Sequence, residues 1–408
     1  MKINKCRICS SKKLSKLFSL GKQSFTGKFP NSLNHKIAKD YINLILCNKC
    51  KLVQLDRNFN PNFLYGKDYG YRTGINSTMS NHVKLVAKEA IKISKPKQKD
   101  YILDIASNDG TLLNNYGKEF ITVGIDPLVN KYKKFYKKAH HKISNFFSVK
   151  NLKKYNLDKK YKIITALSMF YDLKDPNSFI KDVKKILHND GIFILEHADL
   201  LSILKYSLFD TICHEHLEYY SSKIIIELMK KNKLRVFDIK NSKINGGSTR
   251  YFITHDNSKY NTNIKKISKI LKEEKKFQLE KKETFLRFFK KINLIKKKIM
   301  NLLNTIVKNK KTVHGYGAST KGNELLQYFG IDSKHLNYIA ERNPLKYNKF
   351  TPGTYIKIIS EKKSRHLKPN YYFVLPWHFK NEIVKRETKM RNSGTKLIFP
   401  LPKLKIIS

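Results

Sequence analysis

The sequence predicts an α/β protein with a small cysteine-rich domain at the N-terminus and two Rossmann-like domains after it. Three observations carry this prediction. Two CxxC pairs lie in the first 50 residues, strand-like and helix-like stretches alternate from residue 100, and a second strand, glycine turn and helix pattern begins near residue 312. A chain of 408 residues also exceeds what one hydrophobic core usually supports, so several domains are expected.

The first domain, predicted over residues 1–66, contains four of the five cysteines. Cys6 and Cys9 form one CxxC pair, and Cys47 and Cys50 form the other. Each pair places two sulfurs on one tight turn, and two such turns supply the four thiolates of a tetrahedral zinc site. Redox pairs or disulfides are the alternatives, but a cytoplasmic chain is expected and no thioredoxin-like βαβ pattern follows either pair. Four protein ligands leave no position for water, so the expected zinc is structural.

The central domain is predicted over residues 67–257. It starts with a tyrosine-rich segment broken by Gly70 and Gly74, which is either a lid or packing between domains, and a helix is expected to begin near residues 76–80. Further along, strands are predicted over 101–107, 121–127, 161–170 and 191–200, and helices over 111–120, 130–143 and 175–187. This alternation favours a parallel, doubly wound sheet, which binds ligands at the carboxyl ends of its strands.

The turn after the first of these strands indicates a nucleotide-type ligand. A class I S-adenosylmethionine site has an acidic residue followed by three alternate glycines, which let the backbone approach the ligand. Here Asp104 takes the acidic position and Gly110 the last glycine position. Asp126 ends the next strand, where an acid accepts hydrogen bonds from ribose hydroxyls. The predicted cofactor contacts are Asp104, Ala106, Ser107, Asn108, Gly110, Asp126 and Pro127.

Residues 258–311 combine charged and aliphatic side chains at helical spacing without proline or glycine, which predicts one long helix or a helical pair as a connector. The second Rossmann-like domain is predicted over residues 312–408. Its glycine turn would let the backbone approach a ligand, and the helix after it offers N–H groups to an anion, although a plain tight turn is the alternative. The predicted substrate contacts here are Gly315, Gly317, Ser319, Lys321, Glu341, Arg342 and Asn343.

The formal net charge of +51 does not by itself indicate a nucleic-acid partner. The excess is mostly lysine, is spread along the chain and accompanies heavy use of isoleucine and asparagine, which is typical of a compositional bias. Most of this charge is expected to be solvated, with a smaller share attracting a phosphorylated small substrate. No apolar run approaches the roughly 18 residues of a membrane span, and no signal peptide is evident, so a cytoplasmic protein without a membrane partner is expected.

The stretch CHEHLEYYS at residues 213–221 contains the residue types for acid/base chemistry. Such chemistry begins with the removal of a proton from the substrate. A histidine suits this step because its ordinary pKa lies near neutrality, and a neighbouring carboxylate can orient the imidazole. A catalytic metal site is one alternative, although the spacing is not HExxH and no third ligand is evident, and buried histidines that only pack are another.

Motifs along nearly the whole chain resemble those of one protein family. They are CRIC, CNKCKLVQL, YGYRTG, ILDIASNDGTLL, GIDP, MFYDLKDP, FDTICHEHLEYYS, NGGSTRYFITH, VHGYGASTKGNELL, ERNPLKYNKFTPGTYI and LPWHF. In this order they resemble the zinc-containing sugar C-methyltransferases that act on nucleotide-linked ketosugars. SNDG followed by HEH is much more specific than either motif alone, and the replaced glycines are normal in that family.

The resemblance implies methyl transfer from S-adenosylmethionine to a carbon, at C3, of an NDP-4-keto-deoxysugar. The family's general base corresponds to His216 and its acidic partner to Glu215. The active-site phenol corresponds to Tyr71, with Tyr69 as the rival position. The sugar would lie between the central and C-terminal domains. From the central domain, Asn245, Gly246 and Arg250 would contact it, although a hairpin turn is the alternative for this segment.

The chain departs from some relatives at two places. Cys213 stands where they have a tyrosine, and Tyr171 and Asp172 stand where they have a histidine, so the helper groups stay open. An O- or N-methyltransferase acting on a carbohydrate is the alternative function. A zinc-containing protein that binds or modifies nucleic acid is a third, although the motifs of base methylation are missing. The expected partner is a nucleoside-diphosphate sugar rather than nucleic acid, and the expected state is a monomer or a homodimer.

Overall fold

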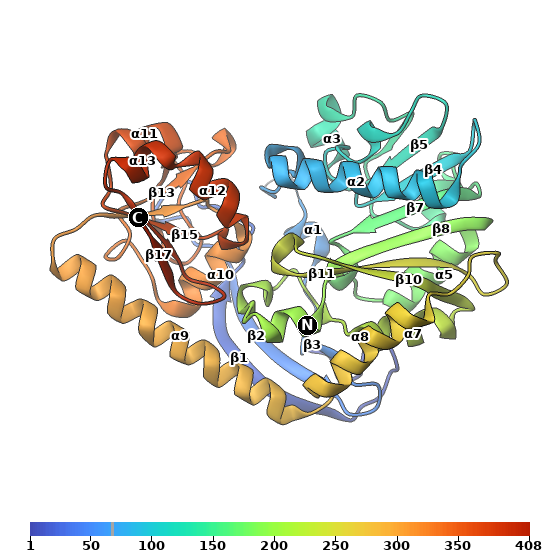
Figure 1. The fold of residues 1–408 in the computed structure, drawn as a ribbon, viewed down its shortest axis with the longest axis horizontal. Helices are drawn as coiled ribbons and strands as arrows, with labels where there is room; N and C mark the ends of the chain where they lie inside the picture. Colours follow the sequence, from blue (N-terminus) through green and yellow to red (C-terminus); the bar gives the residue numbers. More distant parts are fainter. Residues whose placement is uncertain (67–68) are drawn as a thin grey trace.

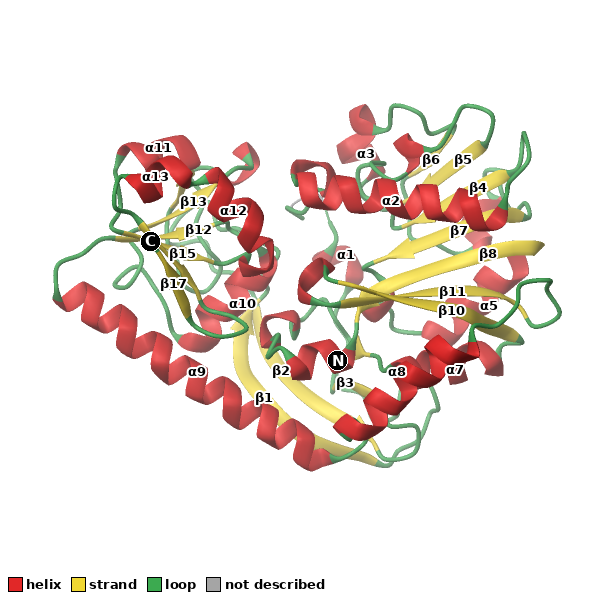
Figure 2. Ribbon diagram, in the orientation of Figure 1, coloured by secondary structure: helices red, strands yellow, loops and turns green. Residues whose placement is uncertain are grey.

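The computed structural model describes residues 1–66 and 69–408, which form three β-sheets with helices packed on them. In Figures 1 and 2 the central sheet lies on the right and the C-terminal sheet on the left, while β1 and β2 lie below and between them. The predicted α/β class is confirmed: a cysteine-rich N-terminal body is followed by two Rossmann-like bodies. The predicted divisions after residues 66, 257 and 311 stay predictions.

The N-terminal sheet has four antiparallel strands in the order β1-β2-β3-β9. They are β1 (Leu14–Ser24), β2 (Lys39–Cys47), β3 (Val53–Leu55) and β9 (Glu218–Tyr219). β9 comes from the middle of the chain, directly after the CHEHL stretch. Because the ladder places Val53 opposite Tyr219 and Gln54 opposite Glu218, the cysteine-rich body fixes the register of the residues that follow the histidines.

The central sheet has the order β10-β11-β8-β7-β4-β5-β6. Its parallel strands are β4 (Tyr101–Ile105), β5 (Ile121–Ile125), β6 (His141–Ile143), β7 (Tyr161–Leu167) and β8 (Leu187–Ala198). The strands β10 (Leu234–Ser242) and β11 (Ser248–His255) extend it in antiparallel fashion. The chain leaves β4 toward β5 and β6 and returns to β7 on the other side, so the switch point lies at the carboxyl ends of β4, β5 and β7.

Helices cover the central sheet on its faces. The predicted helix at residues 76–80 is α2 (Ser77–Ser94), which begins where the Asn76 side chain accepts a hydrogen bond from the N–H of Met79 (3.2 Å) and lies across one face in Figure 2. The others on this sheet are α3 (Val129–Tyr132), α4 (Val149–Lys153), α5 (Pro176–Ile186) and α7 (Ser222–Lys231). The short helices α1 (Pro61–Leu64) and α6 (Leu200–Lys205) instead pack in the core that the N-terminal sheet shares with the C-terminal body. The predicted helix over 175–187 is thereby confirmed as α5.

One predicted helix of this domain is wrong, and the one over 130–143 is confirmed only at its start, in α3 and the 3-10 turn Lys133–Phe135. Residues 111–120 form only a short 3-10 turn, Leu113–Asn115. Two asparagines there bond to backbone carbonyls instead: Asn114 donates to the oxygen of Phe135 and Asn115 to that of Thr111, each at 2.8 Å. Residues 130–143 end in β6, because the edge of the sheet beside β5 offers this segment ladder hydrogen bonds that a helix would forgo.

The connector is the predicted helical pair, α8 (Ile264–Phe277) and α9 (Lys282–Lys308). The break falls at Gln278, whose φ of 57° is left-handed, so it needs neither proline nor glycine. In Figure 1, α9 runs along β1 from the central body to the C-terminal one, and its Phe289 stacks on Phe18 at a centroid distance of 4.7 Å. Within residues 1–66 and 69–408, no helix is both long and apolar enough to cross a membrane.

The C-terminal sheet has the order β14-β13-β12-β15-β16-β17. Its strands are β12 (Val313–Tyr316), β13 (Tyr338–Glu341), β14 (Ile358–Ser360), β15 (Tyr371–Val374), β16 (Lys396–Phe399) and the antiparallel β17 (Lys405–Ile407). Its helices are α10 (Thr320–Phe329), α11 (Glu361–His366), α12 (Lys380–Arg386) and α13 (Thr388–Asn392). β12 lies between β13 and β15, so its carboxyl end is a second switch point.

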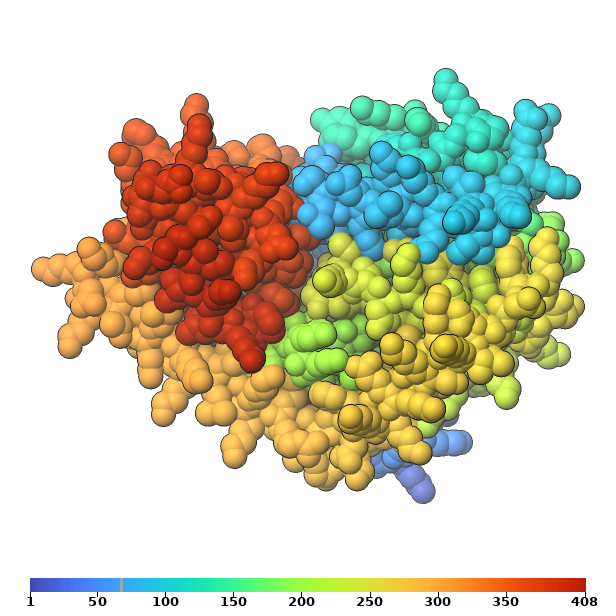
Figure 3. Space-filling view, in the orientation of Figure 1, coloured from blue at the N-terminus to red at the C-terminus, as the bar shows by residue number. Residues whose placement is uncertain are grey.

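The N-terminal sheet also packs on the C-terminal body. Apolar residues of β1, β2 and β3 share one hydrophobic core with α9, α10 and the C-terminal sheet. Asn323 on α10 donates a hydrogen bond to the carbonyl oxygen of Thr26 (2.8 Å), and the indole of Trp377 donates to Asp210 of the central body (2.8 Å). Figure 3 shows the C-terminal residues in direct contact with those of the central body. These contacts fix the distance between the two switch points.

Arg7, inside the first CxxC turn, ties that turn to β9. Its guanidinium donates hydrogen bonds to the carbonyl oxygens of Leu55 (2.8 Å), Arg57 (2.8 Å) and Leu217 (3.3 Å). The guanidinium also lies 3.6 Å from the carboxylate of Glu218, and the two side chains are 3% and 0% exposed. A pair so far from water depends on both partners, because either charge alone would be buried without compensation.

Replacing this guanidinium tests the link. Arg7→Met should lower the free energy of unfolding by about 3–5 kcal/mol, because buried carbonyl oxygens lose their donors and Glu218 loses its counter-charge. Urea unfolding followed by circular dichroism measures this change. Lys12→Met, at an exposed position nearby, is the matched control and should change stability by less than about 0.5 kcal/mol. Equal stability of the two variants would contradict the proposed link.

Candidate active site

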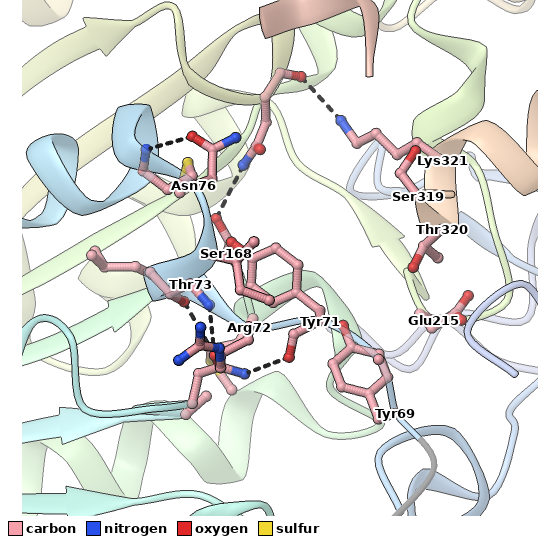
Figure 4. A pocket seen from close by; sticks show the side chains of 18 of the residues that line it. Tyr69, Tyr71, Arg72, Thr73, Asn76, Ser168, Glu215, Ser319, Thr320 and Lys321 are labelled. Atoms are coloured by element: carbon pink, nitrogen blue, oxygen red, sulfur yellow. Dashed lines mark hydrogen bonds between the residues drawn. The ribbon is translucent and has the colours of Figure 1, made fainter. Parts of the chain in front are cut away.

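A cavity of about 570 Å³ lies between the central and C-terminal bodies. Its walls are the carboxyl ends of β4, β5 and β7, residues 69–73, residues 213–217 before β9, and the loops after β12 and β13. Figure 4 shows Arg72 and Thr73 on one side of it and Ser319 and Lys321 on the other. The cavity thus joins the two switch points, where folds of this type bind their ligands.

The central end of the cavity is lined by predicted cofactor contacts, namely Asp104, Ala106, Ser107, Asn108, Asp126 and Pro127. Ala106 and Asn108 occupy positions that are glycine in the general motif, and both have left-handed φ values, 56° and 52°. Such a conformation costs roughly 1–2 kcal/mol for a residue with a Cβ. The turn therefore keeps the backbone path of a glycine-rich turn although the glycines are replaced.

Asp126 and Asp104 hold this turn in different ways. Asp126, at the end of β5, accepts hydrogen bonds from the N–H groups of Asn108 (3.0 Å) and Leu128 (2.7 Å). Burial raises the pKa of Asp126 to about 6, which these two bonds oppose. Asp104 accepts a hydrogen bond from the hydroxyl of Thr165 (2.6 Å), and burial raises its pKa to about 7. Asp126 is therefore the better-placed acceptor for ligand hydroxyls, and Asp104 supports the strand end.

Two predicted glycine contacts lie away from the cavity. Gly110 has a φ of 73°, and a Cβ there would lie 2.5 Å from the ring of Tyr136. Gly315 lies within β12, where a Cβ would lie 2.2 Å from the side chain of Ile339. Both positions need glycine for packing inside the protein, so the expectation of direct ligand contact is corrected for both.

Arg250 is a further correction. It lies in β11, is 4% exposed and does not line the cavity. Its guanidinium donates to the carboxylates of Glu196 (2.7 Å) and Glu89. Glu196 in turn contacts the imidazole of His82 at 2.5 Å, and both of these residues do line the cavity. The charge of Arg250 is therefore paired within the protein. Through Glu196 and His82, Arg250 supports the cavity wall without lining it.

His216 lies in the turn before β9, and its half-buried ring lines the cavity. Nδ1 lies 2.6 Å from the carbonyl oxygen of Thr211. Because a carbonyl oxygen only accepts, Nδ1 carries the ring proton and Nε2 keeps its lone pair. Burial lowers the pKa of His216 to about 3, and the positive charge of Lys321 adds to this, so the near-neutral pKa expected from the sequence does not hold in the ligand-free protein. The ring packs on Tyr171 at a centroid distance of 4.1 Å, so a neutral imidazole is held in one orientation.

Glu215 does not orient this ring, which corrects the expectation from the sequence. Its carboxylate accepts hydrogen bonds from the hydroxyl of Thr26 at 3.2 Å to each oxygen, and the carbonyl of Thr211 orients the imidazole instead. Glu215 lines the cavity next to His216, as Figure 4 shows for its carboxylate, and burial raises the pKa of Glu215.

Tyr71 and Tyr69 both line the cavity. The backbone oxygen of Tyr71 accepts hydrogen bonds from Tyr132 (3.1 Å) and from the side chain of Asn108 (3.3 Å), which ties this segment to the cofactor turn. The Tyr71 side chain is 43% exposed. Burial raises the pKa of Tyr69 well above its ordinary value, and the carboxyl of Glu215 nearby adds to this rise. Tyr71 thus lies toward the cofactor end of the cavity and Tyr69 toward Glu215.

The far end of the cavity belongs to the C-terminal body. Asn245 joins the two bodies: its side chain donates to the hydroxyl of Ser168 (3.3 Å), and its carbonyl oxygen accepts from Nζ of Lys321 (3.0 Å), as drawn in Figure 4. Glu341, at the end of β13, accepts from the N–H of Ala318 (2.7 Å) and holds the loop after β12 as Asp126 holds the first turn. The other predicted contacts that line this end are Gly317, Ser319, Lys321, Arg342 and Asn343.

Sequence reasoning missed other cations of the cavity wall. Arg72 lines the central side, and Lys346 and Arg386 line the C-terminal side. Nζ of Lys346 donates to the carbonyl oxygen of Ala318 (2.7 Å), and Arg386 donates to the hydroxyl of Tyr316 (2.9 Å). Nothing in their spacing separates these residues from the other lysines and arginines of a chain with a net charge of +51.

The four cysteines predicted as metal ligands lie together at the other end of the N-terminal sheet. Their Sγ atoms all lie within 4.8 Å of one another, and Cys6–Cys50 and Cys9–Cys47 are the pairs at 3.5 Å. Four sulfurs bound tetrahedrally at 2.3 Å from zinc would be about 3.8 Å apart. All five cysteines of the chain are free thiols. The cluster therefore fits a zinc ion with four protein ligands.

Family models match the chain in succession along nearly its full length. A zinc binding domain matches residues 6–65, a methyltransferase domain residues 79–238, and a C-methyltransferase C-terminal domain residues 243–402. The chain belongs to the S-adenosylmethionine-dependent C-methyltransferases. The predictions of S-adenosylmethionine as cofactor and of zinc at the cysteine cluster are confirmed for this C-methyltransferase.

The C-methyltransferase is also similar to individual proteins. It is 25% identical over 413 residues to the C-methyltransferase NovU of Streptomyces niveus. The alignment covers 100% of this chain and 97% of that protein. Among solved structures it is similar to an S-adenosylmethionine-dependent methyltransferase of Clostridium acetobutylicum, with a TM-score of 0.35, 15% identity, and 42% and 90% of the two chains covered. Magnesium protoporphyrin IX methyltransferase of Synechocystis PCC 6803 gives a TM-score of 0.34, 12% identity, and 44% and 88% coverage.

Removing one thiolate tests the zinc site of the C-methyltransferase. Cys47→Ser should lower the bound zinc well below one ion per chain and lower the melting temperature by about 10 °C or more, because metal binding free energy is folding free energy here. Metal analysis and thermal unfolding measure the two effects. Cys213→Ser changes the one cysteine outside the cluster and should keep its zinc. Full zinc content in Cys47→Ser would show that the cluster is not the metal site.

Proposed function

We propose that this C-methyltransferase methylates C3 of an NDP-4-keto-deoxysugar through an enolate formed by His216. The observation that carries the proposal is the neutral imidazole at the wall of a cavity that joins the two nucleotide-type switch points. One end fits a methyl donor and the other presents cations to a phosphorylated substrate. The resemblance to sugar C-methyltransferases, read from motifs along the chain, supports the same substrate class.

The ring of His216 suits proton abstraction. Its Nδ1–H bond to Thr211 leaves Nε2, which makes no hydrogen bond within the described residues, as the basic atom. The low pKa of His216, caused by burial, keeps the ring unprotonated in the ligand-free protein. When the proton arrives, the enolate that forms beside the imidazolium supplies the counter-charge, so base and substrate stabilise each other. An α-proton is acidic only next to a carbonyl, which is why a ketosugar is the substrate class proposed.

The central end of the cavity is the proposed place of the methyl donor. Bound S-adenosylmethionine supplies an electrophilic sulfonium methyl group. Asp126 would accept hydrogen bonds from the ribose hydroxyls, while the turn at Ala106, Ser107 and Asn108 would lie against the rest of the cofactor. Tyr71 would lie between cofactor and sugar, since its segment is tied to Asn108. Holding carbanion and methyl group in line supplies much of the rate enhancement.

The C-terminal end is the proposed place of the nucleoside diphosphate. The N-terminus of α10, capped by Ser319, faces the cavity and offers N–H groups and a positive dipole end to an anion. Lys321 and Arg342 line the same end, where Arg342 also pairs with Glu382 at 3.2 Å. Glu215, which lines the cavity beside His216, would support the protonated base electrostatically. Asn245 would contact the sugar close to its own hydrogen bond with Lys321.

Replacing the base tests the proposal. His216→Asn keeps a polar side chain of similar size but lacks a basic atom, so methyl transfer to an NDP-4-keto-deoxysugar should fall by at least about 1000-fold. Binding of S-adenosylhomocysteine, measured by calorimetry, should stay unchanged because the cofactor end is separate. His35→Asn, at an exposed position, is the matched control and should keep full activity. Activity of His216→Asn near the control level would mean that another base acts.

A further inference from the structure

Asp172 ends the 3-10 turn Phe170–Asp172 after β7 and lines the same cavity as His216. Its backbone N–H donates to the carbonyl oxygen of Met169 (3.0 Å), which holds the turn at the cavity wall. Oδ1 of Asp172 is enclosed and accepts no hydrogen bond from the described residues. The side chain as a whole is only half-buried and lines the cavity, and its carboxyl group also has a hydrogen bond with the Tyr65 side chain.

The surroundings of Asp172 disfavour a negative charge. The titratable groups that face it belong to the end of α1 and the segment after it, to its own turn, and to the residues around β9. They are Tyr65, Tyr69, Tyr171, Cys213, Glu215, Glu218 and Tyr220. All of these are neutral or acidic groups. Burial raises the pKa of Asp172 well above its ordinary value; the Tyr65 hydroxyl opposes this rise, and the charge of Glu215 adds to it.

An enclosed oxygen without a partner has different consequences in the two protonation states. In a carboxylate both oxygens share the charge, so one of them would be buried without a donor or a counter-ion. In the acid form Oδ1 is an ordinary carbonyl oxygen, whose missing hydrogen bond costs much less. The proton then sits on the oxygen that faces the cavity. The geometry therefore favours a carboxylic acid whose O–H points toward a ligand.

We propose that Asp172 is a second catalytic residue, which donates a hydrogen bond from its carboxyl group to the substrate's carbonyl oxygen while His216 removes the neighbouring proton. This inference rests on the proposed function and names the donor that stabilises the enolate oxygen. A backbone hydrogen bond joins the segments that carry the two groups: the N–H of Leu217, next to His216, donates to the carbonyl oxygen of Tyr171, next to Asp172, at 2.6 Å. A donor fixed where charge develops is a major source of catalysis.

The C–H bonding pair becomes the C=C bond as the proton passes to Nε2 of His216, and the carbonyl π pair moves to the oxygen that faces Asp172. The C=C pair then forms the new bond to the methyl carbon, the C–S bond breaks with its pair on sulfur, and the carbonyl is restored. Asp172 keeps its proton throughout, and His216 releases its proton to water.

Two variants separate a donor from a structural residue. Asp172→Ala removes the donor and should lower kcat about 100-fold or more, with S-adenosylhomocysteine binding unchanged by calorimetry. Asp172→Asn keeps an N–H donor of similar shape that does not titrate, so it should keep much of the activity. Asp158→Asn, at an exposed position, is the matched control with wild-type kinetics expected.

The pH dependence gives the decisive readout. Only the protonated carboxyl donates, so wild-type kcat should fall as the pH rises through the pKa of Asp172, and Asp172→Asn should lack this alkaline fall. The same alkaline fall in Asp172→Asn, or wild-type kcat in Asp172→Ala, would overturn the inference. Failure of the wild-type protein to methylate carbon of a ketosugar would instead overturn the proposed function, so the two failures are distinguishable.

Discussion

The hydrogen bond between Nδ1 of His216 and the carbonyl oxygen of Thr211, at 2.6 Å, is the constraint on which the site depends. It decides which nitrogen carries the proton, and therefore which nitrogen can act as a base. The ring has no alternative orientation that keeps this bond, because Tyr171 packs against it. A neutral imidazole with a fixed lone pair suits the removal of a proton from carbon better than the binding of an anion.

That bond persists only if the turn around it is held, and the N-terminal body holds it. Residues after His216 continue into β9, which pairs with β3 of the cysteine-rich body, and Arg7 of the first CxxC turn donates to the carbonyl oxygen of Leu217. The same sheet shares a core with the C-terminal body. The cysteine cluster is thereby connected to the turn of His216 through one strand pair and one guanidinium.

Local pattern made much of this predictable. CxxC spacing predicts the cysteine cluster, alternation of strands and helices predicts the parallel sheets, and an acid at the end of the second strand predicts Asp126, since each leaves a signal in short stretches of sequence. Predictions failed where long-range contacts decide. Arg250 is held by Glu196 and Glu89 from distant elements, and residues 130–143 become partly a strand because an edge of the sheet is available. The partner of His216 is a backbone carbonyl, which no side-chain pattern encodes.

The most direct test of the account is proton exchange at C3 in an NDP-4-keto-deoxysugar, followed by NMR in heavy water with the protein and S-adenosylhomocysteine in place of the methyl donor. The account predicts that the C3 proton signal disappears much faster with the protein than without it, because the base acts before methyl transfer. A C3 signal that stays at its uncatalysed rate, while the protein with S-adenosylmethionine methylates an oxygen of the same sugar, would contradict it.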